Sequence, residues 1–322
     1  MLRNMKRIKW LMAILAAIAS ILLIANVASK PWLKARAQPV IAHAEFINPE
    51  PIVIQGYSGP QQDPTISPDG LYLFFDSHND DGQTTYLYWA QRIDYKTFKF
   101  MGEVQGVNFP GAMTLRGNYD LAHNFYFVSL KFRNSCGMIT QGIFNKGSVT
   151  NIKPVRGICA PSPPPGYMNV TFDVAISPDG KTLYYSNAVV ANSGRPESSR
   201  IAVASKNDDG SFTPLPKSDE LFQSVNALAS SVYNSAPTPD GLTFFFTPNI
   251  FPTGPAIYVV TRLSTLEPFG TPHPFAEAND NPNFASWSYS EMGGVSPDGN
   301  YLYFHRVLSK KSSQIYVLTR QR

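Results

Sequence analysis

Charged side chains are scarce in this chain. Of its 322 residues, 16% are charged, 43% are hydrophobic and 13% are aromatic, and there are 27 prolines and 22 glycines. A chain this apolar is not disordered, and it is long enough to bury a large core in one big domain or two small ones. Few charges combined with many aromatic and turn-forming residues favour an all-β protein.

Cysteine is nearly absent, and the common catalytic and metal-binding motifs are missing. The sequence has no Cys-x-x-Cys, no zinc-like Cys/His spacing, no His-Glu-x-x-His, no Gly-x-Ser-x-Gly and no glycine-rich phosphate loop. We therefore expect no metal and no cofactor. In an oxidising compartment, Cys136 and Cys159 would form a disulfide that contributes on the order of 3 kcal/mol. Two buried free thiols are the alternative.

The N-terminus has the pattern of an export signal. Four basic residues and no acidic one precede an apolar run from Trp10 to Ala25. We expect residues 1–37 to be a signal peptide or an N-terminal membrane anchor, and residues 38–44 to be a linker. In both cases the remainder lies outside the cytoplasm, in the periplasm, and only residues 10–27 contact the membrane.

The basic net charge belongs to this same segment. Seven of the 27 Lys and Arg residues lie within residues 1–37, which contain no Asp or Glu. The rest of the chain carries 20 basic and 23 acidic residues, so that its net charge is about −3 instead of the +4 of the whole chain. A charge of this sign gives no reason to expect a nucleic-acid partner.

A repeat organises the rest of the sequence. Four segments join a Ser/Thr-Pro-Asp-Gly turn to an aromatic strand: 63–75, 173–185, 234–246 and 292–304. The Ser/Thr positions are 67, 177, 238 and 296, so that the first gap is twice as long as the others. A degenerate fifth copy, 116–128, lies in that gap and keeps the strand but not the turn sequence. Proline and glycine in this order suit a tight hairpin between two strands.

Each copy is followed by a third strand and a weaker fourth strand. Four strands in a repeat of about 55–60 residues are typical of a propeller blade. The last copy ends after its third strand, whereas residues 45–54 resemble a strand that has no blade of its own. We therefore predict an all-β fold, a single five-bladed propeller over residues 45–322, whose ring is closed by the N-terminal strand pairing with the last blade.

The Ser-Pro-Asp-Gly turn, the aromatic strand and the later Ile-Tyr-Val strand resemble the TolB-like, WD-related propeller repeat of bacterial envelope proteins. The resemblance covers nearly the whole exported part. It implies a non-enzymatic binding or scaffolding module of the cell envelope, with an envelope protein, a peptide or a carbohydrate as partner. Two departures prevent the transfer of TolB's own partners: there are five blades instead of six, and no separate domain precedes the ring.

The residue four positions before each Ser/Thr is expected at the start of an innermost strand, near the mouth of the central channel. These residues are Asp63, Arg116, Asp173, Asn234 and Met292, with Glu291 beside the last. Carboxylates that converge there could act as general acid and base in a glycoside hydrolase, with Asp63, Asp173 and Glu291 as catalytic residues. Because Arg116 interrupts the series, a charge-paired rim of Asp63, Arg116 and Asp173 is the simpler interpretation.

Aromatic side chains in the loops that enter the inner strands are expected at the same mouth. Trp287 and Tyr289 offer a large contact area to a sugar or peptide at low entropic cost. The predicted ligand-binding residues are therefore Asp63, Arg116, Asp173, Asn234, Trp287, Tyr289 and Glu291. A purely structural ring that holds a partner by its blade edges is the third possibility.

Overall fold

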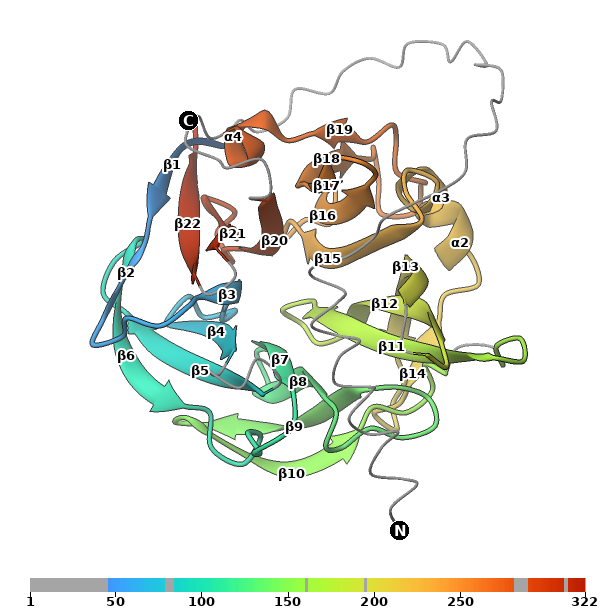
Figure 1. Cartoon of the computed structure of the whole chain (residues 1–322), viewed down its shortest axis with the longest axis horizontal. Coiled ribbons are helices and arrows are strands. Elements are labelled where there is room, and N and C mark those ends of the chain that lie inside the picture. The colour runs from blue at the N-terminus through green and yellow to red at the C-terminus, as the bar shows by residue number, and fades with distance from the viewer. Residues whose placement is uncertain are drawn as a thin grey trace.

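The computed structural model describes residues 46–78, 84–159, 162–193, 196–280, 289–309 and 312–321. The predicted export segment and linker lie outside these residues. Five β-sheet blades surround a central axis and follow one another in chain order, as the colours of Figure 1 show. None of the helices in the described ranges is both long and apolar enough to cross a membrane.

The first three blades each contain four antiparallel strands, which are ordered from the axis outward. Blade 1 consists of β3 (Gln62–Ile66), β4 (Tyr72–His78), β5 (Thr85–Arg92) and β6 (Thr97–Glu103). Blade 2 consists of β7 (Thr114–Tyr119), β8 (Asn124–Ser129), β9 (Ile139–Asn145) and β10 (Ser148–Pro154). Blade 3 consists of β11 (Tyr167–Ile176), β12 (Thr182–Ala191), β13 (Pro196–Lys206) and β14 (Phe212–Pro214).

The last two blades are less regular. Blade 4 consists of β15 (Ser231–Pro237), β16 (Thr243–Ile250), β18 (Tyr258–Thr261) and β19 (His273–Pro274), with the short β17 (Gly254–Pro255) beside β16. Blade 5 consists of β20 (Tyr289–Val295), β21 (Tyr301–Ser309) and β22 (Ser312–Arg320). Within the described ranges, three single-turn helices lie in the connections: α2 (Ser218–Leu221), α3 (Gln223–Asn226) and α4 (Ala276–Asn279).

The N-terminal strand joins the last blade to the first. β1 (Phe46–Pro51) pairs antiparallel with β22, and Phe46 lies opposite Arg320. β2 (Val53–Gln55) then pairs with β6 of blade 1. The predicted pairing of this strand with the last blade is thus present, and blade 5 obtains its fourth strand from the other end of the sequence.

Uninterrupted aromatic strands are explained by burial on both faces. In β16, Phe244 and Phe246 pack between blades 3 and 4, whereas Phe245 packs between blades 4 and 5. The second strand of every other blade alternates in the same way. Since successive side chains of a strand point to opposite faces, a strand between two neighbouring blades must be apolar at every position. The resulting hydrophobic clusters occupy the junctions between successive blades and between blades 5 and 1.

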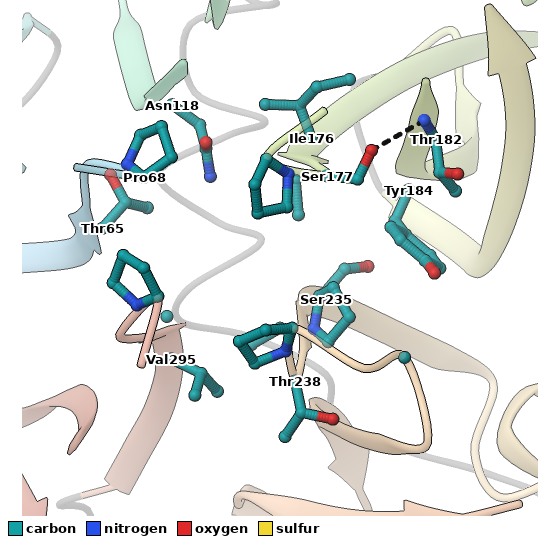
Figure 2. Close-up of a pocket in the computed structure, with 18 of the residues that line it drawn as sticks. Thr65, Pro68, Asn118, Ile176, Ser177, Thr182, Tyr184, Ser235, Thr238 and Val295 are labelled. Carbon is teal, nitrogen blue, oxygen red and sulfur yellow. Dashed lines mark hydrogen bonds between the residues drawn. The ribbon is translucent and has the colours of Figure 1, made fainter. Parts of the chain in front are cut away.

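The repeated turn has the predicted conformation. In blade 3 the Gly180 amide donates to the Ser177 carbonyl at 2.8 Å, and Gly180 has a left-handed φ of 71°. The Ser177 hydroxyl accepts a hydrogen bond from the Thr182 amide, which Figure 2 shows. The degenerate copy in blade 2 makes an equivalent turn with other residues, because Asp120 takes the serine position and His123 adopts the left-handed conformation at φ 63°.

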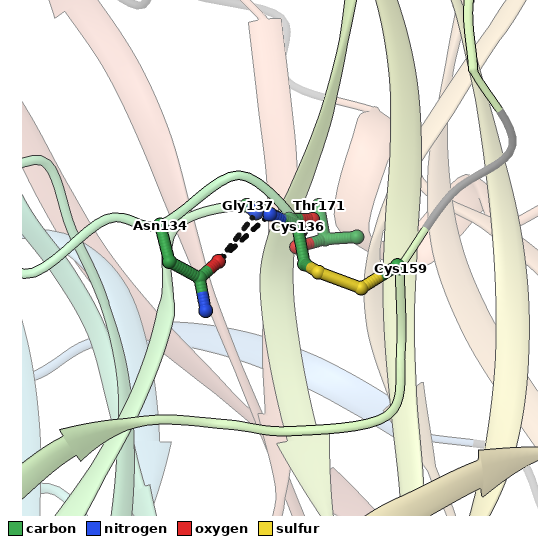
Figure 3. The surroundings of a disulfide bond; sticks show 5 residues. All are labelled: Asn134, Cys136, Gly137, Cys159 and Thr171. Carbon is green, nitrogen blue, oxygen red and sulfur yellow. Dashed lines mark hydrogen bonds between the residues drawn. A yellow bond between two sulfur atoms is a disulfide. The ribbon is translucent and has the colours of Figure 1, made fainter.

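The predicted disulfide between Cys136 and Cys159 is present (Figure 3). Cys136 lies in the β8–β9 loop of blade 2, and Cys159 lies in the connection to blade 3. The Cys136 carbonyl accepts a hydrogen bond from the Thr171 hydroxyl at 3.0 Å. The disulfide therefore links the β8–β9 loop to the connection between blades 2 and 3, next to β11.

We expect the double substitution Cys136→Ser and Cys159→Ser to lower the free energy of unfolding by on the order of 3 kcal/mol, because the open loop gains entropy in the unfolded chain. Urea unfolding followed by tryptophan fluorescence measures this change. A reductant should destabilise the wild type by a similar amount and leave the double variant unchanged. A wild type that is insensitive to reductant would contradict the structural role of the bond.

Candidate functional site

A β-bulge interrupts each innermost strand and turns one residue toward the axis. The pairing register shifts at these points in all five blades. Asp63, Arg116, Asp173 and Asn234 have φ between 46° and 58°, a left-handed conformation that is uncommon for residues other than glycine. The prediction that these residues begin their strands was therefore wrong, because they lie inside strands, at bulges that the sequence pattern does not reveal.

Arg116 occupies the axis and contacts every blade. From β7 of blade 2, its Nε lies 2.7 Å from Asp173 Oδ1 of blade 3, and its Nη1 lies 3.5 Å from Asp63 Oδ1 of blade 1. The same guanidinium donates to the carbonyl of Ser235 in blade 4 and to the carbonyls of Met292 and Gly293 in blade 5. Only 3% of Arg116 is exposed, so these contacts replace its hydration.

Buried polar residues on the second strands accept hydrogen bonds from the backbone amides that the bulges leave without a partner in the sheet. Asp63 N donates to His305 Nδ1 at 3.2 Å, and Arg116 N donates to Asp76 Oδ2 at 3.3 Å. Met292 N donates to the Thr247 hydroxyl at 2.9 Å. In each case the acceptor belongs to the preceding blade around the axis. Interblade hydrogen bonds of the same kind therefore compensate the backbone groups freed by the bulges.

At the channel mouth, Asp63 and Glu291 face each other across His305. An oxygen of each carboxylate and a ring nitrogen of His305 lie within 4.8 Å of one another. Glu291 accepts a hydrogen bond from the Tyr233 hydroxyl at 2.8 Å and lies 3.4 Å from His305 Nε2. These residues border a cavity of about 80 Å³, which Asp76, Asn234 and Tyr289 also line.

Asp76 is a second carboxyl group beside Asp63. It is fully buried, and among the described residues its Oδ1 has no hydrogen-bond partner. Burial, followed by the negative charge of Asp63, raises the pKa of Asp76 well above its ordinary value. Asp76 can therefore retain its proton at a pH at which an isolated carboxyl group is ionised.

Three of these groups could also hold a cation. Asp63, Glu291 and His305 supply two carboxylates and one imidazole, which are usual ligands of divalent ions. Because His305 Nδ1 accepts a hydrogen bond from the Asp63 amide, the neutral ring carries its proton on Nε2, so that binding a cation would require His305 to give up that hydrogen bond or that proton. The expectation of no metal came from missing sequence motifs, and the fold brings these residues together from distant parts of the chain.

The predicted ligand-binding residues divide into three groups. Asp63, Asn234, Tyr289 and Glu291 line the cavity at the mouth. Arg116 and Asp173 also border it, but they are only 3% and 2% exposed and hold each other as an ion pair. The Asp173 carboxylate also accepts hydrogen bonds from the Ser186 hydroxyl and the Ser235 amide. Trp287 lies outside the described residues.

The site also contains residues that the sequence analysis did not select for it. Asp76 and His305 each follow directly after the aromatic segment of a second strand. Asp76 pairs with Gln62 and His305 pairs with Glu291, and the bulge of the innermost strand comes after each of these partners. A buried polar residue at the end of an aromatic run was the available signal. The role of this polar residue depends on a bulge in the next blade, because that bulge frees the backbone amide that donates a hydrogen bond to it.

No family model and no curated protein matches the chain. Solved structures share its fold. One of them is described under the GH130 family of mannoside phosphorylases, which contains glycoside hydrolases that target β-1,2-mannosidic linkages in Candida mannan. It aligns at 12% identity over 88% of this chain and 96% of its own, with a TM-score of 0.53. The α-L-arabinofuranosidase PaAbf62A from Podospora anserina aligns at 12% identity over 85% and 95%, with a TM-score of 0.53.

TolB from Acinetobacter baumannii is a weaker match. It aligns at 18% identity over 64% of this chain and 41% of its own, with a TM-score of 0.34. The comparisons therefore support the propeller that the repeat predicted, but they do not support a TolB-like protein. A Ser-Pro-Asp-Gly turn before an aromatic strand reflects the requirements of a propeller hairpin, so that it indicates the architecture more reliably than the family.

We expect Arg116→Met to lower the free energy of unfolding by about 3–5 kcal/mol, because it leaves Asp173 buried without its counter-charge. Urea unfolding measures the loss, and adding Asp173→Asn to the variant should recover part of it. Arg156→Ala is the control, since Arg156 and Asp209 form an exposed ion pair. If Arg116→Met were as stable as Arg156→Ala, the axial contacts would not hold the blades together.

We expect Asp76→Asn to stabilise the protein relative to the wild type by an amount that grows as the pH rises above 3.8. Asp76 stays protonated to a higher pH in the folded state than in the unfolded state. The free energy of unfolding of the wild type therefore falls as the pH rises from 3.8 to the folded pKa of Asp76. Unfolding measured over a pH series gives the difference. A difference that shrinks with rising pH would show that Asp76 is ionised in the fold.

Proposed function

We propose that the protein is a glycoside hydrolase whose catalytic pair is Asp63 and Glu291. The observation that carries the proposal is the approach of these two carboxylates, whose nearest oxygens are within 4.8 Å, at a cavity on the propeller axis. Retaining glycosidases place their two carboxyl groups about 5–5.5 Å apart, whereas inverting ones leave about 6.5–9.5 Å for a water. The spacing favours retention of the anomeric configuration.

Glu291 is the proposed nucleophile. The Tyr233 hydroxyl donates to Glu291 Oε1, and His305 Nε2 faces Oε2. These two contacts fix the orientation of the Glu291 carboxyl group, and a nucleophile must be held in position to attack the anomeric carbon. The new bond between Glu291 and that carbon forms while the bond to the leaving oxygen breaks.

Asp63 is the proposed acid and base. It exposes 17% of its side chain, and buried Asp76 beside it can keep a proton available. Asp63 would pass that proton to the leaving oxygen and then remove one from the water that cleaves the glycosyl–Glu291 bond. Asp173 has no part in this scheme, because only 1% of its side chain is exposed and its carboxylate is held by Arg116 Nε at 2.7 Å, by the Ser186 hydroxyl and by the Ser235 amide.

The fold neighbours agree with this proposal. The mannan-targeting protein and the arabinofuranosidase are carbohydrate-active by their own descriptions, and Asn234 and Tyr289 border the cavity as candidate sugar contacts. The cavity of about 80 Å³ is smaller than the roughly 300–1,000 Å³ of typical ligand pockets. The described residues would thus form the base of a sugar subsite, and the substrate would extend outward from the axis.

A non-enzymatic binding module of the cell envelope is the second candidate. The small cavity and the engagement of Asp63 by Arg116 favour it, since neither requires chemistry. In both proposals the protein is exported, either released in the periplasm or tethered by its N-terminal segment. The disulfide supports this location, because such bonds persist mainly in oxidising compartments.

Hydrolysis of a panel of aryl glycosides, including β-mannosides and α-L-arabinofuranosides, tests the proposal. We expect Glu291→Gln and Asp63→Asn each to reduce kcat by about 10²–10⁴-fold, because each removes a group that acts in the transition state. Azide should restore turnover to Glu291→Ala by replacing the missing nucleophile.

Asp298→Asn is the matched control, because Asp298 lies in a turn of blade 5 and does not line the cavity at the mouth. Its kcat should equal that of the wild type. Full activity of Glu291→Gln would remove Glu291 from the mechanism. Binding of a glycoside without hydrolysis by the wild type would favour the binding module.

A further inference from the structure

A second and larger cavity lies on the same axis, at the opposite end from the proposed catalytic site. It has a volume of about 460 Å³, and Arg116 lines both cavities and separates them. Most of its lining residues come after the bulge in the sequence of an innermost strand or belong to the Ser/Thr-Pro-Asp-Gly turn at the end of that strand. We call it the turn-face pocket.

The wall of the turn-face pocket is a collar of proline rings. The motif prolines Pro68, Pro178, Pro239 and Pro297 come from four different blades and all line it. Figure 2 shows Pro68 on one side of the opening, with Ile176 and Val295 on other sides. Such a collar offers apolar contact to an aliphatic chain of small cross-section and excludes water from around it.

Hydrogen-bonding groups lie below the collar. The Ser235 hydroxyl is buried, with 1% of the residue exposed, and it has no hydrogen-bond partner among the described residues. Asn118 extends toward the opening in Figure 2. A buried hydroxyl without a partner is costly, so that Ser235 suggests a polar group of a ligand.

The pocket attracts positive charge. Asp179 and Asp240 line it, and hydrogen bonds from Ser177 and Thr238 contribute to lowering the pKa of these carboxyl groups, against the effect of burial at Asp240. The basic residue among the described lining is Arg116, whose charge is already paired with Asp173 and Asp63. Lys181 and Arg320 contribute to lowering the pKa of Asp179 and Asp240, respectively, but neither lines the pocket. Within the lining, an anionic ligand would therefore meet two carboxylates and one cation that is already paired.

We propose that the turn-face pocket binds a basic side chain of an extended partner peptide, with the aliphatic stem inside the proline collar and the cationic head near Asp179 and Asp240. The combination of an apolar wall with charged groups suits arginine and lysine, whose stems are apolar and whose ends are charged. This site is independent of the proposed hydrolase activity, because Arg116 lies between the two cavities.

Binding of a dye-labelled, end-blocked pentapeptide Gly-Gly-Arg-Gly-Gly to the full chain tests the proposal by fluorescence anisotropy. The same peptide with citrulline in place of arginine is the uncharged control. We expect only the arginine peptide to bind, with an affinity that falls as the salt concentration rises. The double variant Asp179→Asn and Asp240→Asn should weaken binding by roughly fivefold to tenfold, because it removes both carboxylates and keeps their turn hydrogen bonds.

Asp298→Asn is the matched variant, because Asp298 makes the same turn contact in blade 5 but does not line the pocket. Its affinity for the arginine peptide should equal that of the wild type, and thermal unfolding should show that all variants fold. Equal binding of the citrulline peptide, equal loss in Asp298→Asn, or no binding of the arginine peptide would overturn the proposal. Competition by cellotriose instead would identify the pocket as a sugar site.

Discussion

The buried guanidinium of Arg116 is the contact on which the rest of this structure depends. A propeller leaves a channel on its axis, and inner strands that bulge toward it bring unpaired backbone groups and carboxylates into a space from which water is largely excluded. Arg116 supplies hydrogen-bond donors to carbonyls of blades 4 and 5 and a positive charge to Asp63 and Asp173. A single side chain thereby links all five blades.

This axial contact also separates the two ends of the channel. On one side, the bulges expose Asp63 and Glu291 beside His305, which is an arrangement suited to acid–base and nucleophilic chemistry. On the other side, the motif prolines and turn carboxylates line a larger pocket, for which we propose a basic side chain as the ligand. The same repeat therefore produces two chemically different sites, because the residues before and after each bulge differ in type.

The fold could be predicted from the sequence because its requirements are local and repeated. A tight turn needs proline and glycine at fixed positions, and a strand buried between two blades needs an unbroken apolar run such as Phe244 to Phe246. The degenerate copy was also located correctly, because its strand kept this pattern. Its turn could not be recognised, since Asp120 and His123 satisfy the same geometry with a different sequence.

The site could be predicted only in part. The periodicity identified Asp63, Arg116 and Asp173 as neighbours on the axis, and the sign of their charges suggested the pairing that the structure shows. The roles of Asp76 and His305 were not predictable, because each depends on an amide that a bulge in the next blade releases. Bulges follow from the packing around the axis, which no short sequence pattern records.

The stereochemistry of glycoside hydrolysis tests the account most directly. Proton NMR of the first sugar released from an aryl glycoside distinguishes the two anomers before they equilibrate. Because Asp63 and Glu291 lie too close together to admit a water between them and the sugar, we predict that the product retains the anomeric configuration of the substrate. A product of inverted configuration would contradict the assignment of these two carboxylates as the catalytic pair.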